Sequence, residues 1–139
     1  MSLIDAKLEF SDNQDVKANA ISSNVFDLAS LGDSYRQLGF IYWNTVVSAA
    51  ITGGQLSATL TTKATEPSDD SGTTLAKIII PSGAVAGTAY SVQVPLATAL
   101  RWVGVYYIDV DTAISAANVD SWLGMEPINQ SRNIQPEPA

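Results

Sequence analysis

Short runs of alternating apolar and polar residues constrain this chain more than any other feature. Along 56–61, leucine and alanine alternate with serine and threonine, and the runs 90–94 and 102–110 alternate in the same way. A period of two places successive side chains on opposite faces of a β-strand. Similar strand-like runs occupy 7–10, 16–20, 24–28, 40–47 and 76–80. About eight short strands at this spacing predict an all-β fold, a jelly-roll-like two-layer β-sandwich.

The segments between and after these runs define the rest of the organisation. Gly53 and Gly54 form a candidate hairpin turn, and 113–121 is the best candidate for a short helix, although its alanines are equally suited to a loop. From 127 to 139 the chain has three prolines and little to bury, which is typical of an extended or disordered tail. We therefore expect a β-sandwich domain over 1–126 and a tail over 127–139.

The chain contains neither cysteine nor histidine. Disulfides and thiolate metal sites are therefore impossible, and the fold must be stabilised by packing and hydrogen bonds. Without histidine or cysteine there is also no Ser-His-Asp or Cys-His arrangement for nucleophilic catalysis. We expect a protein that is not an enzyme and that needs no cofactor.

The charge of the chain argues against two classes of partner. It has 14 acidic and 7 basic residues, for a net charge of −7, and no two basic residues are adjacent. Binding to nucleic acid needs clustered lysine and arginine, and an anionic membrane surface repels an acidic protein. The N-terminal residues lack a basic region followed by an apolar run, which is the pattern of a secretory leader. We expect a soluble protein, made and used without export by the secretory route, that binds neither nucleic acid nor membrane.

Asp109 and Asp111 form the sharpest carboxylate pair in the sequence. On one strand their side chains share a face about 7 Å apart, which would suit a calcium site or a glycosidase pair. The other interpretation is that they end the strand and turn the chain, since aspartate is a common turn residue. We favour the turn and expect no metal site.

Aromatic residues provide the candidate interface. The pairs Tyr42–Trp43 and Tyr106–Tyr107 place rings on both faces of a strand. One ring of each pair could therefore face solvent or a neighbouring subunit. The alternative is that the two-layer sandwich buries these rings. Trp122 lies close to the tail and is a further candidate. The predicted interface residues are Tyr42, Trp43, Tyr106 and Trp122, with Ile128 and Ile134 in the tail.

Four segments resemble a known family. They are 3–5 (LID), 8–14 (LEFSDNQ), 23–28 (SNVFDL) and 100–107 (LRWVGVYY). In order and spacing they resemble the capsid cement, or decoration, proteins of tailed bacteriophages. The resemblance implies a jelly-roll protein, a dimer or trimer, on the outer surface of an icosahedral virion. There it would bridge neighbouring major capsid subunits, and the family has no catalytic residues to carry over.

Two function classes follow from these observations. The first is a capsid cement protein, made in the host cytoplasm, whose partner is the major capsid protein. The second is a carbohydrate- or receptor-binding β-sandwich, which the aromatic residues with nearby carboxylates would suit.

Overall fold

The computed structural model describes residues 9–17, 19–28, 41–68, 71–94, 99–110 and 113–124. The elements formed by these residues are all strands, so the predicted all-β class is confirmed. They are β1 (Glu9–Asp15), β2 (Ala20–Ile21), β3 (Phe26–Asp27), β4 (Ile41–Thr52), β5 (Leu56–Lys63), β6 (Thr73–Ile80), β7 (Ala89–Val94), β8 (Trp102–Asp109) and β9 (Ala116–Gly124). The described ranges include no helix long and apolar enough to cross a membrane.

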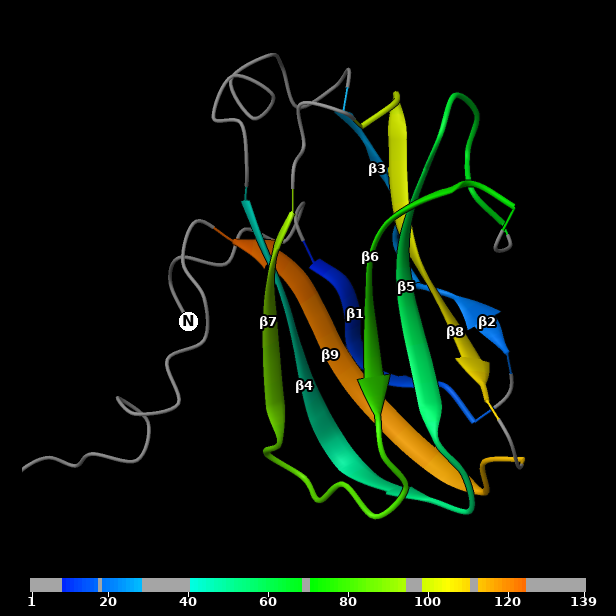
Figure 1. The fold of residues 1–139 in the computed structure, drawn as a ribbon, viewed down its shortest axis with the longest axis vertical. Helices are drawn as coiled ribbons and strands as arrows, with labels where there is room; N and C mark the ends of the chain where they lie inside the picture. Colours follow the sequence, from blue (N-terminus) through cyan, green and yellow to red (C-terminus); the bar gives the residue numbers. More distant parts are fainter. Residues whose placement is uncertain are drawn as a thin grey trace, which may run out of the picture.

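The strands form two antiparallel sheets that pack face to face (Figure 1). One sheet has the order β1-β9-β4-β7, and the other has the order β2-β8-β5-β6, with β3 also paired to β8. The predicted two-layer sandwich is therefore confirmed. In the described part of the chain, β7 and β6 are the edge strands at one side of the two sheets, and β1 and the β2–β3 pair are at the other.

The strand pairings are nested, and this nesting identifies the fold as jelly-roll-like. β5 pairs with β6, β4 with β7, β2 and β3 with β8, and β1 with β9. The chain is thus one long antiparallel hairpin with its tip at the β5–β6 connection. Rolling this hairpin brings β4 against β9 and β5 against β8, which closes the two sheets in the manner of a jelly roll.

The core lies between the sheets and is one continuous cluster of buried side chains. Phe10 of β1 stacks on Phe26 of β3 with ring centroids 4.6 Å apart. The largest fully buried side chains come from both layers: Trp43, Tyr107, Phe10, Ile41, Ile51, Leu56, Leu60, Ile80, Leu123, Val16 and Val47. Each fully buried aliphatic or aromatic side chain contributes about 1.5–3 kcal/mol, so packing stabilises this fold without disulfides.

The predicted helix over 113–121 is wrong, because most of this segment belongs to strand β9. Ala117, Val119 and Leu123 point into the core in alternation. β9 also has a strand on each side, since it pairs with both β1 and β4. Pairing on both edges and burial of alternate side chains outweigh the weak helix propensity of the alanines.

The Gly53–Gly54 turn does not make a hairpin, since β4 and β5 belong to different sheets. Gly53 has a φ of 94°, in the left-handed region. A Cβ there would lie 2.8 Å from the backbone nitrogen of Ser115. Only glycine fits this position, where the chain passes from one sheet to the other.

Gly104 of β8 lies under a small cover on the outer face of the five-stranded sheet. A Cβ at Gly104 would be 2.8 Å from Cγ1 of Val25 and 3.4 Å from Cγ of Pro67. Pro67 is buried although it lies in a loop. The loop after β5 and the β2–β3 connection therefore close over the sheet where β8 has no side chain.

We predict that Gly104→Ala destabilises the protein by about 1–3 kcal/mol, because the added methyl group overlaps the stiff Val25 side chain. Gly124→Ala is the matched control, since its Cβ would meet no described atom closer than 3.4 Å. Urea unfolding of the two variants checks this. Equal stabilities of the two variants would contradict the close packing at Gly104.

Candidate functional site

A chain of polar groups crosses the interior and joins the two sheets. The hydroxyl of Tyr107, on β8, lies 2.8 Å from Oγ of Ser11 on β1, and it also hydrogen-bonds Ser121 on β9. The indole Nε1 of Trp43 donates to Oγ of Ser121 at 2.7 Å. Oγ1 of Thr45 lies 3.2 Å from the same Ser121 oxygen. Each of these buried polar groups therefore has a partner inside the sandwich.

This polar chain is structural. Burial raises the pKa of Tyr107 to about 12, and the hydrogen bonds to Ser11 and Ser121 offset only part of that effect. The phenol is consequently neutral near neutral pH and does not exchange protons there. These buried polar side chains hold the two sheets in one relative position, because moving either sheet would leave buried donors and acceptors unpaired.

Trp43 is therefore not available as an interface residue. Its side chain is 0% exposed and belongs to the core. Its neighbour Tyr42 points outward and is half-buried. Likewise Tyr107 points inward, and Tyr106 points outward and is half-buried. The expectation of one inward and one outward ring per pair holds, and alternation along the strand selects Tyr42 and Tyr106 as the outer rings.

The outer face of the four-stranded sheet carries Tyr42 and Trp122, both half-buried. In the strand register, Tyr42 is opposite Gly124 and Asn44 is opposite Trp122. The indole of Trp122 and the amide of Asn44 both lie beside Gly124, where the absence of a side chain leaves them room. Tyr42 and Trp122 are thus diagonal neighbours on one face.

Carboxylates surround the Trp122 side of this face. Glu9 is opposite Trp122 on β1, and its pKa is raised by burial and then by the nearby charges of Asp12 and Asp120. Oδ1 of Asp120 accepts a hydrogen bond of 2.6 Å from the backbone N–H of Asn13. Within the described ranges, no three His, Cys, Asp or Glu side chains are grouped so that they could hold a metal ion.

Asp109 is the last residue of β8 and is half-buried. Its backbone N–H donates to Oδ1 of Asn19 at 3.1 Å. This position agrees with the strand-end interpretation of the Asp109–Asp111 pair. Asp111 lies outside the described residues.

The outer face of the five-stranded sheet is different in character. The outward row of its central strand β8 is Trp102, Gly104, Tyr106 and Ile108, and the inward row of the same strand includes Val103, Val105 and Tyr107. The outward row is uncharged and mostly apolar, and the inward row is apolar up to Asp109 at the end of the strand. In an antiparallel sandwich the outward row is normally polar, so β8 has the composition of a strand that is covered on both faces.

The rows beside β8 add small polar groups and lysines. Opposite the β8 row lie Ser57, Thr59, Thr61 and Lys63 of β5, and beyond them Ile79, Lys77 and Thr74 of β6. Ile79 is 39% exposed. At the β3 side, Arg101 makes a bidentate ion pair with Asp27, with distances of 2.9 and 2.8 Å, and its guanidinium lies 5.9 Å from the centre of the Trp102 ring.

The predicted interface residues therefore do not form one site. Tyr42 and Trp122 lie on the outer face of one sheet, and Tyr106 lies on the outer face of the other. Ile128 and Ile134 lie outside the described residues. The sequence reasoning missed Trp102, Ile79 and the two lysines, although alternation already placed Trp102, Tyr106 and Ile108 on one face.

Comparison with protein-family models and with curated proteins finds no match for this chain.

We predict that alkaline pH destabilises the protein through Tyr107. Its folded-state pKa of about 12 exceeds the ordinary value of 10.0. The stabilisation is therefore complete below pH 10 and is lost as pH rises toward about 12. The loss is about 3 kcal/mol, and denaturant midpoints across this range measure it.

Tyr107→Phe is the control for this titration, because lysines also lose their charge at high pH. The variant should be less stable than the wild type at pH 8 by about 1–3 kcal/mol, since Ser11 and Ser121 lose a partner. Its stability should then fall less steeply above pH 10. Parallel curves for both proteins would show that Tyr107 does not titrate as described.

Proposed function

We propose that this chain is a capsid cement protein that binds the outer surface of an icosahedral phage shell and bridges neighbouring major capsid subunits. The observation that carries the proposal is the outer row of β8, which is apolar on a face where an isolated sandwich is normally polar. The four segments that resemble the decoration proteins of tailed phages support it as well. One of them, 100–107, includes most of β8.

The interior of the protein suits a bracing role. The two sheets share one packed core, and hydrogen bonds from Tyr107 and Trp43 pass through it. Close-packed interiors have low compressibility and transmit force. A block of this kind can hold two neighbouring surfaces at a fixed spacing.

The stabilisation of the shell follows from mass action. A protein that binds the assembled lattice and not its separated subunits favours the lattice. At a free concentration of 100 times the dissociation constant, each copy contributes about 2.7 kcal/mol. Because a shell offers many equivalent sites, these contributions add up over the particle.

The charge of the chain is consistent with the outer surface. Its net charge of −7 opposes a position against packaged DNA on the inside of a shell. We place the protein on the outer capsid surface of the virion, made in the host cytoplasm and acting as a dimer or trimer.

A second candidate function is carbohydrate or receptor binding by the outer face of the four-stranded sheet. The observation that favours it is the diagonal pair Tyr42 and Trp122, with Glu9 opposite Trp122. Aromatic rings with a neighbouring carboxylate are suited to stacking on a sugar and hydrogen-bonding its hydroxyls.

The cement proposal predicts that the purified protein binds empty shells assembled from the major capsid protein of the same genome and raises their melting temperature. Co-sedimentation measures binding, and calorimetry of the shells with and without the protein measures stabilisation. Unassembled capsid subunits are the control and should not bind. Shells that neither bind the protein nor melt at a higher temperature would refute the proposal.

The alternative predicts retention of the protein on a glycan array, with loss of retention in Trp122→Ala. Trp102→Ala is the matched control, because it removes a half-buried outward tryptophan from the other sheet. Retention that survives Trp122→Ala, or no retention of the wild type, would exclude the sugar-binding face.

A further inference from the structure

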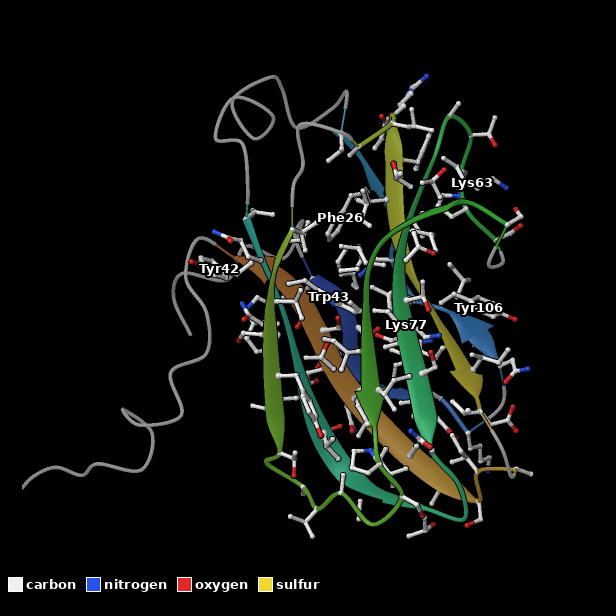
Figure 2. The ribbon with its side chains drawn as sticks, viewed as in Figure 1. Phe26, Tyr42, Trp43, Lys63, Lys77 and Tyr106 are labelled. Carbon is white, nitrogen blue, oxygen red and sulfur yellow. The ribbon has the colours of Figure 1, made fainter. Side chains whose placement is uncertain are left out.

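One outer surface of the sandwich combines two lysines that pair with no described carboxylate with two partly exposed isoleucines. It is formed by β5, β6 and β8, and we call it the lysine face: Thr59, Lys63, Lys77, Ile79, Tyr106 and Ile108. Figure 2 shows Lys77 and Tyr106 beside β5, with Lys63 toward the end of that strand. The cover over Gly104 lies between the Tyr106 and Trp102 positions of β8, so the part around Lys77 is the open part of this face.

The register arranges the open part in two rows. In one row, Thr59 of β5 has Tyr106 on one side and Lys77 on the other. In the next row, Ser57 has Ile108 on one side and Ile79 on the other. Directly opposite side chains have Cβ atoms about 4.5–5.5 Å apart, so a single partner surface can meet the ammonium group, the phenol ring and both isoleucines together.

The positive charge of this face is not neutralised within the described residues. The ion pairs among the described residues lie outside this face and join Lys17 to Asp15 and Arg101 to Asp27. Lys63 donates to the hydroxyl of Ser71 at 2.7 Å, and no described carboxylate pairs with it. Lys77 is exposed on the middle of an edge strand. The net charge of the chain is −7, whereas the six residues of this face include two lysines and no carboxylate.

Ser57 lies between Ile79 and Ile108 in the second row. It is 2% exposed, and its hydroxyl has no hydrogen-bond partner among the described residues. Because this hydroxyl is shielded, the row offers a partner its two isoleucines rather than a polar group.

From these observations we infer that the lysine face binds an acidic protein surface, and, resting on the proposed function, that this surface belongs to the major capsid protein. Carboxylates on the partner match Lys63 and Lys77, and apolar groups match Ile79 and Ile108. A sugar is disfavoured here because the six residues of the face include no amide or carboxylate side chain. Nucleic acid is disfavoured because two lysines make too few phosphate contacts.

A charge reversal with a matched control tests the inference. Lys77→Glu and Lys17→Glu change the net charge equally and alter exposed side chains, and Lys17 makes only a 3.9 Å ion pair with Asp15. On the shells described above, Lys77→Glu should weaken binding by about tenfold, and Lys17→Glu should leave it within about twofold. Binding of the wild type should weaken as salt is added.

A second measurement does not depend on shells. The ¹⁵N-labelled protein is titrated with a short peptide rich in glutamate and leucine, and amide signals are followed by NMR. Signals from 56–63, 73–80 and 102–109 should shift, and Lys77→Glu should abolish the shifts while Lys17→Glu retains them. Well-dispersed amide spectra of the two variants before peptide is added show that both are folded.

The outcomes separate the two proposals. If shells bind the wild type and Lys77→Glu equally well, the lysine face is refuted and the cement function stands. If shells bind neither protein but the acidic peptide maps to the lysine face, the cement function is refuted and the acidic-partner surface stands. Peptide shifts on the four-stranded sheet, or none anywhere, would overturn the lysine face.

Discussion

The pairing of β4 with β9 and of β5 with β8 is the constraint on which the rest of this structure depends. These two ladders close the rolled hairpin into a sandwich. They also decide which side of each strand is inside, because a slip of one residue would turn every side chain to the opposite face. Such a slip on β4 would bring Tyr42 into the core and expose Trp43. The outer surfaces that we assign to partners are therefore fixed by the same ladders that build the core.

The polar groups in the core restrict the sandwich further. Apolar packing alone tolerates some sliding of one sheet on the other, since aliphatic side chains repack at low cost. Tyr107 does not tolerate it, because its hydroxyl on β8 is hydrogen-bonded to Oγ of Ser11 on β1, in the other sheet. This arrangement gives a single alignment of the layers, as satisfied buried networks do in other proteins. A protein that braces other surfaces needs such a fixed alignment more than it needs extra stability.

Alternation along the chain was sufficient to locate β5, β7 and β8, where apolar and polar residues follow a period of two. It failed at β9, because Ala113, Ala116 and Ala117 have no strand preference and the strand is specified by its two neighbours. It also failed at Gly53, since a glycine turn looks the same whether the chain returns to its own sheet or enters another. The nested order of pairing is a property of contacts between distant residues, which no local pattern contains.

Among the candidate surface residues, too, some positions followed from the local sequence pattern and others depended on contacts between distant residues. The outward position of Tyr106 followed from the strand period, whereas the burial of Trp43 required knowledge of which face meets the second sheet. The lysine face could not be predicted at all. Lys63 and Lys77 are separated along the chain, and they come together only because β5 and β6 are neighbours. Chemistry that depends on such neighbours becomes visible only in three dimensions.

The nested order has a consequence for biosynthesis. Glu9 in β1, the first of the described strands, lies opposite Trp122 in β9, the last of them. β1 therefore has no partner while the remainder of the chain is being translated. By contrast, β5 and β6 are close in the sequence and can pair early. Long-range closure of this kind is slow, because the entropy of a large loop is lost before its contacts form. The nascent chain consequently carries an unpaired amino-terminal strand until translation reaches the end of the sandwich.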